Sequence, residues 1–197
     1  LLDDGAQFDS ISVNVSPIQL WQGSFVGTVI DCLEHHRVDP QQLCLEITEN
    51  VLVDHDDDRT WSRLRQLSKL GIRLSIDDFG TGYCSLSYLD HLPFDQLKVD
   101  RSFVDGLDLN PRRKELFAGI VSLGHSLGLE IAGEGIERAE ELAIVFDLGA
   151  EVAQWYLLGR PGPAIDAPRH TAVGVVATAL RGPSSDLQIA NGHGGQP

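Results

Sequence analysis

Short apolar runs alternate with longer amphipathic stretches along most of the chain. The runs are β-branched or alternate with polar residues, which predicts six strands, at residues 11–16, 43–48, 72–77, 96–100, 129–136 and 153–159. The stretches between them space apolar residues at helical intervals, which predicts one long or two shorter helices at 17–36 and further helices at 56–71, 112–128 and 138–150. Strands that alternate with helices indicate βαβ units and a parallel sheet.

This pattern fades after Pro161. The residues from 164 to 197 are rich in Gly, Pro, Ala and Ser, a composition typical of segments that build no packed core. We therefore expect a folded region over residues 1–163 and a low-complexity, disordered tail over 164–197, with at most a weak helix around TAVGVVATAL.

Charge and apolar content restrict the class of protein. The chain has 197 residues and a net charge of −14, which argues against a nucleic-acid polymer as partner because phosphate binding normally needs a basic face. An anionic ligand could still bind through metal cations. No run approaches the roughly 18 apolar residues of a membrane span.

The cysteines and the first residue bear on the cellular setting. Cys32, Cys44 and Cys84 show no CxxC spacing, so we expect reduced thiols in a cytoplasmic protein. The chain contains no Met and begins at Leu1, which suggests a piece of a longer protein.

Polar side chains recur near the carboxyl end of each expected strand. They are Asn14, Glu46, Asp77, Asp78, Lys98, Asp100, Glu134, Glu137 and Gln154. In a parallel barrel these ends converge on one face, where active sites of such barrels lie. The sequence thus predicts a mouth that gathers several acids.

Several carboxylates in one mouth repel each other unless some are protonated or cations neutralise them. Oxygen ligands of this kind suit Mg²⁺ or Mn²⁺. The adjacent Asp77 and Asp78 suit two ions, if a kink in the backbone lets both face the site. Two such ions are a common device for phosphodiester hydrolysis. Proton abstraction next to a carboxylate uses similar groups and stays an alternative. A solvated turn at the Asp pair, or a simple Lys98–Asp100 ion pair, is the plainer interpretation.

The chain resembles the EAL-domain cyclic-di-GMP phosphodiesterases over about residues 8–163. The matching segments, in family order, are SVNVSPIQL, LCLEITENVL, LSIDDFGTGYCSLSYLDHLPFDQLKVDRSFV, LGLEIAGEGIER and QWYLLGRP. The resemblance implies an α/β fold of modified (β/α)8, TIM-like type. It is incomplete here, with about six of the eight strands, because the strand with the Glu-Ala-Leu motif has no counterpart.

The resemblance also implies a two-metal site that holds Mg²⁺ or Mn²⁺. Asn14, Glu46 and Asp77 match the ligands of the first ion. Asp77 would bridge to a second ion that Asp78 also binds.

The remaining roles are implied in the same way. Glu134 matches the general base for the attacking water, and Lys98 matches the residue that orients water or stabilises developing charge. Glu49 matches the residue that holds the loop after the Asp pair. The residues matching second-shell or substrate positions are Glu137, Gln154 and Asp100.

Three positions depart from the family pattern: Cys84 replaces a usual Ser, Gly133 a usual Ala, and Trp155 a usual Gly. Two functions therefore compete. The first is metal-dependent hydrolysis of cyclic-di-GMP to the linear dinucleotide in a bacterial signalling pathway. The second is a degenerate domain that acts as a cyclic-di-GMP receptor or protein-interaction module. A homodimer, and an upstream sensor or GGDEF domain in the parent chain, are the partners that the resemblance implies.

Overall fold

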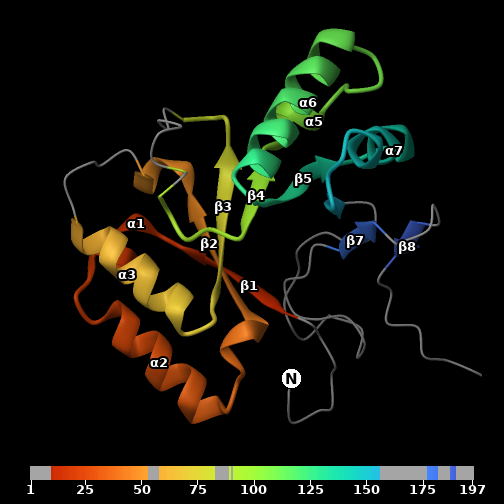
Figure 1. Ribbon diagram of the computed structural model, residues 1–197. Coiled ribbons are helices and arrows are strands. Elements are labelled where there is room, and N and C mark those ends of the chain that lie inside the picture. The colour runs from red at the N-terminus through yellow and green to blue at the C-terminus, as the bar shows by residue number, and fades with distance from the viewer. Residues whose placement is uncertain are drawn as a thin grey trace, which may run out of the picture.

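The computed structural model describes residues 10–52, 58–82, 89, 91–155, 177–181 and 187–189. Within them one sheet runs from β1 to β8 in sequence order. Its first six strands are parallel: β1 (Ile11–Val15), β2 (Leu43–Thr48), β3 (Arg73–Phe79), β4 (Gln96–Val99), β5 (Glu130–Ile136) and β6 (Val152–Trp155). They curl into half of a barrel, as Figure 1 shows, so the expected α/β fold with about six strands is confirmed.

Helices connect these strands and cover the outer face of the sheet (Figure 1). They are α1 (Pro17–Trp21), α2 (Phe25–His36), α3 (Asp58–Lys69), α5 (Arg101–Val104), α6 (Pro111–Ser126) and α7 (Ala139–Asp147), with 3₁₀ turns η1 (Pro40–Gln42) and η2 (Glu49–Leu52). Ser16 and Gln19 form a capping box at the start of α1, and Asn110 caps α6. The helix expected over 17–36 breaks after α1, where Gln22 becomes extended.

The two faces of the sheet differ in chemistry. Residues on the outer face are buried and apolar and pack in one core with the helices, for example Ile47, Ile76 and Leu97. Their sequence neighbours point the other way, onto the concave face, and most of them are polar. Parallel strands are usually apolar on both faces, so the alternation marks the concave face as the functional one.

A polar layer lines the lower part of the concave face, at the amino ends of the strands. Glu130 Oε2 accepts hydrogen bonds from Arg73 Nη2 at 2.7 Å and from Gln96 Nε2 at 2.8 Å. Ser75 Oγ donates to Gln96 Oε1 at 3.1 Å. These contacts tie β3, β4 and β5 together directly below the carboxyl ends of the same strands.

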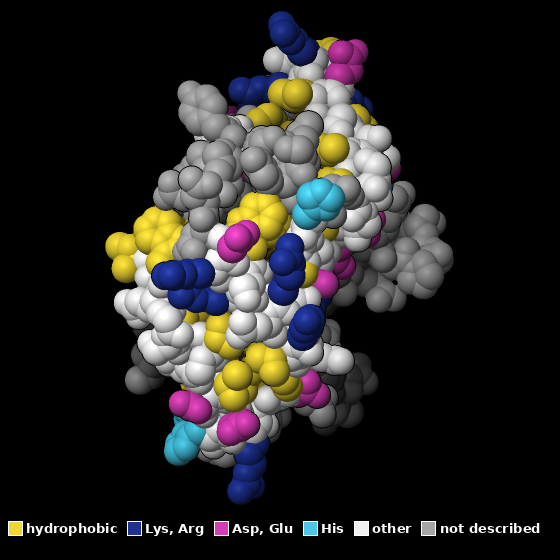
Figure 2. Space-filling model, turned by 60° about the vertical axis from the view of Figure 1, so that its left-hand side comes forward, with side chains coloured by type: hydrophobic (Ala, Val, Ile, Leu, Met, Phe, Trp, Pro, Cys, Tyr) yellow, Lys and Arg dark blue, Asp and Glu magenta, His cyan; other side chains and the backbone are white. Residues whose placement is uncertain are grey.

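The side of the molecule formed by α1, α2 and α3 exposes apolar residues. Ile18 is 68% and Trp21 is 42% exposed. Figure 2 shows hydrophobic and basic side chains next to each other on this face. No helix in the described part of the chain has the length and apolar character needed to cross a bilayer.

Two short strands belong to the segment expected to be a disordered tail. β7 (Ala177–Arg181) pairs with β6, and β8 (Leu187–Ile189) pairs with β7, both antiparallel. The weak helix considered at 171–180 is therefore wrong at residues 177–180. The boundary expected at 163 lies outside the described residues and stays a prediction.

Candidate active site at the carboxyl ends of the strands

Lys98 lies at the centre of a cluster of carboxylates. Its Nζ is close to one oxygen from each of three other strands, at 2.6 Å from Glu134, 2.8 Å from Asp77 and 3.0 Å from Glu46. The Lys98 side chain is only 6% exposed, so these contacts replace water around the ammonium. The expected gathering of acids around Lys98 is therefore present in the fold.

The register of the sheet brings these four side chains together. Glu46 lies beside Ser75 of β3, and Lys98 lies beside Ala132 of β5. Side chains alternate between the two faces along a strand. Asp77, two residues after Ser75, and Glu134, two residues after Ala132, therefore lie on the same concave face. Each strand from β2 to β5 thus contributes one charged group to the cluster.

Asp78 joins this cluster through an irregularity in β3. The pairing with β4 shifts register between Ile76 and Phe79, and Asp78 has a φ of 55°, in the left-handed region. Two adjacent residues of a regular strand would point to opposite faces. Here carboxylate oxygens of Asp77, Asp78 and Glu134 all lie within 4.8 Å of one another. The kink that a shared site requires is thus present.

The charges of the cluster are strongly coupled. Burial raises the pKa of Glu134 to about 7, which outweighs the lowering by Lys98, and Asp77 adds to the rise. Burial would lower the pKa of Lys98, but Glu134 and its neighbours hold it above its ordinary value. Burial, together with the charges of Asp77 and Asp100, raises the pKa of Asp78. One ammonium does not neutralise four carboxylates.

Glu49 contacts the loop that follows the Asp pair. It is 3% exposed at the start of η2, and its Oε2 accepts hydrogen bonds from the N–H groups of Gly80 at 2.8 Å and Gly82 at 3.2 Å. Gly80 has a φ of 97°, which favours glycine. These contacts are those expected of a residue that holds the loop.

The other expected site residues surround the cluster. Asn14 is exposed on β1 and lies beside Glu46 in the register. Gln154 is half-buried on β6. Asp100 accepts a hydrogen bond from the Ser102 N–H at 2.9 Å and so caps α5. Glu137 forms an ion pair with Arg101 at 2.8 Å. The roles expected of these residues stay predictions.

The departures from the family pattern can be examined at one position. A Cβ at Gly133 would lie 2.9 Å from Val145 Cγ1 of α7, so Val145 fills the space that an Ala would need. Cys84 and the side chain of Trp155 lie outside the described residues.

Contacts around Arg101 and Arg138 were not foreseen from the sequence. Arg138 pairs with Asp108 and Glu141, and Glu141 is buried. The only signal in the sequence was an acid in the first turn of the expected helix, where the Glu141 carboxylate can accept the N–H of Arg138 at the helix start.

The cluster has the composition of a site for hard divalent cations. All its acidic donors are carboxylate oxygens, and Asp77, Asp78 and Glu134 already converge. Lys98 leaves part of the carboxylate charge uncompensated, and the pKa values of Glu134 and Asp78 are raised. Both observations fit a site that binds further positive charge.

Comparisons with known proteins identify the family of the chain. The family model of the EAL domain matches residues 2–161. The bifunctional diguanylate cyclase/cyclic di-GMP phosphodiesterase MucR of Pseudomonas aeruginosa is 40% identical over 163 residues, which are 83% of this chain and 24% of MucR. The signaling protein YkoW of Bacillus subtilis is 36% identical over 154 residues, which are 78% of this chain and 19% of YkoW.

Solved structures show the same fold. The MucR phosphodiesterase in complex with c-di-GMP has a TM-score of 0.73 at 40% identity, over 79% of this chain and 63% of that one. The manganese/cy-diGMP complex of Klebsiella pneumoniae BlrP1 has a TM-score of 0.69 at 30% identity, over 75% of this chain and 38% of that one. The chain spans only about a fifth to a quarter of the curated relatives named above. The match covers most of its own length, and the chain belongs to the EAL domain family.

Proposed function

We propose that this domain hydrolyses one phosphodiester bond of cyclic-di-GMP to give the linear dinucleotide. The observation that carries the proposal is the contact of Lys98 with Glu46, Asp77 and Glu134 beside the left-handed Asp78. The names of the MucR and BlrP1 complexes support the choice of ligand, because both contain this dinucleotide.

The reaction would use Mg²⁺ or Mn²⁺ held by the acidic cluster. Asn14, Glu46 and Asp77 would bind one ion, and Asp77 with Asp78 would bind the second. Ions in such sites polarise the phosphoryl oxygens and lower the pKa of bound water. The BlrP1 complex with manganese supports this set of cofactors.

Glu134 is the general base in this proposal. In the metal-free fold burial raises its pKa to about 7, and cations bound beside it would favour the carboxylate form that accepts a proton. It would take the proton of the attacking water while the water oxygen bonds to phosphorus. The bond from phosphorus to the leaving sugar oxygen then breaks, that oxygen takes a proton from solvent, and Glu134 returns its own proton to solvent. Lys98 remains an ammonium because its three carboxylate neighbours raise its pKa. It keeps Glu134 oriented and offers positive charge to the developing oxyanion.

The competing function is a receptor that binds cyclic-di-GMP without cleaving it. The replacement of a usual Gly by Trp155 favours this alternative, since it puts a bulky residue directly after Gln154. A homodimer, an attached GGDEF or sensor domain, and a cytoplasmic setting are further proposals that rest on the family.

The deciding experiment measures turnover of cyclic-di-GMP with Mn²⁺ by this chain and by Glu134→Gln. Cleavage that the variant lacks supports the phosphodiesterase. No cleavage by a chain that is folded by circular dichroism, with saturable binding of the dinucleotide, supports the receptor. Neither cleavage nor binding would reject both.

A further inference from the structure

The segment after β4, residues 101–108, contacts residues 134–138 at two separate places. These are the last three residues of β5, where the pairing with β6 is irregular, and the two residues that follow; together they are called the turn below. The first contact is made by Arg101. A Cβ added to Gly135 would lie 2.6 Å from Cβ and Cγ of Arg101, so the aliphatic part of Arg101 lies directly over that glycine. The guanidinium of Arg101 continues to Glu137, where Nη2 and Oε1 form an ion pair at 2.8 Å.

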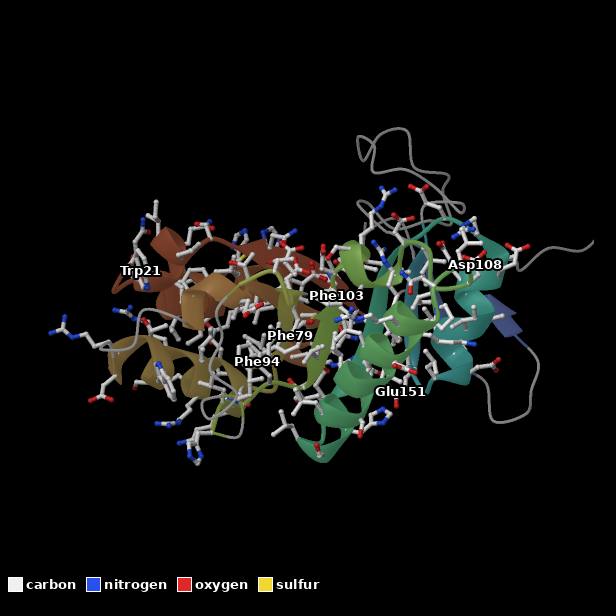
Figure 3. The ribbon with its side chains drawn as sticks, turned by 90° about the horizontal axis from the view of Figure 1, so that it is seen from above. Trp21, Phe79, Phe94, Phe103, Asp108 and Glu151 are labelled. Carbon is white, nitrogen blue, oxygen red and sulfur yellow. The ribbon has the colours of Figure 1, made fainter. Side chains whose placement is uncertain are left out.

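The second contact is further along, at the start of α7. Arg138 donates two hydrogen bonds to Asp108, at 2.8 Å and 2.5 Å. Glu141 accepts a bond from the Gly106 N–H at 3.0 Å and bonds from the N–H groups of Glu137 and Arg138 at 3.3 and 3.2 Å. Figure 3 shows Asp108 beside α7, in agreement with these bonds.

The two contacts act on different parts of the turn. The Asp108–Arg138–Glu141 contact holds the end that leads into α7. The three heavy atoms nearest to a Cβ built at Gly135 all belong to Arg101, and Gly135 directly follows Glu134 and has a φ of 65°. The stem of Arg101 therefore packs against the backbone next to Glu134.

We propose that Arg101 is a positioning residue for the general base. It holds the turn at Gly135 and the carboxylate of Glu137, and through them it fixes the direction of Glu134 toward Lys98. This inference rests on the proposed function for its kinetic consequence, but its structural consequence can be measured separately.

A matched control exists on the other side of α6. His125 Nε2 and Glu151 Oε1 form a hydrogen bond of the same length, 2.8 Å, and their side chains are 41% and 43% exposed. The Arg101–Glu137 pair is 52% and 53% exposed. His125→Gln therefore removes a comparable surface pair that is remote from the mouth.

The test compares Arg101→Ala, Arg101→Lys and His125→Gln with the unmodified chain. Steady-state kinetics with cyclic-di-GMP and Mn²⁺ give kcat and KM. Hydrogen exchange of the amides of residues 134–138, without metal or ligand, reports the order of the turn. For Arg101→Ala we expect kcat to fall about tenfold with little change in KM, and exchange in the turn to accelerate. Arg101→Lys should recover most of both, because it keeps the stem and the charge. His125→Gln should change neither.

Two results would overturn the inference. A higher KM at unchanged kcat for Arg101→Ala would make Arg101 a contact of the ligand instead. Unchanged exchange of residues 134–138 would show that Arg101 does not order the turn. If the unmodified chain has no turnover at all, the proposed function fails. The exchange measurement then still decides whether Arg101 holds the turn.

Discussion

Glu134 should make the metal-free fold less stable as the pH rises from about 4.5 to about 7. Its pKa is 4.5 as an ordinary carboxyl group and about 7 in the folded chain, because it is buried beside other acids. Between these values the folded chain binds a proton that the unfolded chain has lost, so raising the pH favours unfolding. At about 1.4 kcal/mol per pKa unit, the contribution lost across this window is about 3 kcal/mol.

The assay is urea unfolding followed by circular dichroism, in EDTA, at several pH values from 4.5 to 7.5. The variant is Glu134→Gln, which keeps the shape of the side chain and cannot titrate. The free energy of unfolding of the unmodified chain should fall relative to that of the variant by about 3 kcal/mol across the range. Glu34→Gln, an exposed change on α2, should leave the pH dependence as it is.

A constant difference between the two chains from pH 4.5 to 7.5 would refute the reasoning. It would mean that Glu134 is already ionised at low pH in the folded chain, with its charge held by Lys98. The cluster would then be a compensated ion network rather than a site with a proton to exchange.

Three further changes test the packing and the charges. Lys98→Met leaves buried carboxylates unpaired and should cost about 3–5 kcal/mol at pH 7 in EDTA; urea unfolding should show part of the loss recovered at pH 5, and an equal loss at both values would contradict the explanation. Gly133→Ala should destabilise the fold by about 1–3 kcal/mol because of Val145; adding Val145→Ala should remove part of that cost in a double-mutant cycle, and strict additivity would argue against the contact. Cys32 is exposed, whereas burial raises the pKa of Cys44 to about 11; a thiol reagent at pH 8 should modify Cys32 before Cys44, as peptide mapping would show, and equal rates for these two would contradict the burial of Cys44.

Much of the fold follows from local patterns in the sequence. The six parallel strands were predictable because β-branched runs such as ISVNV and LCLEIT alternate with amphipathic stretches. The position of Lys98 among the acids was also predictable, since parallel strands place their carboxyl ends on one face.

Other features depend on contacts between distant segments, which no local pattern carries. α5 has only four residues, too few for a helical period to appear. The pairing of Arg101 with Glu137 joins the first residue of α5 to the residue that follows β5. The absence of a side chain at Gly133 is explained by Val145 of α7, which fills the space that a Cβ would need.

The left-handed conformation of Asp78 has a consequence for ion number. A non-glycine residue in this region costs of the order of 1 kcal/mol, so the surrounding contacts must maintain it. If Asp78 relaxed to an extended conformation, its carboxylate would turn to the opposite face from Asp77, and the proposed second ion would lose a ligand. Two chains with the same set of acids could thus hold one ion or two. The number of bound ions would then depend on one backbone dihedral angle, the φ of Asp78, which lies next to the loop that Glu49 contacts.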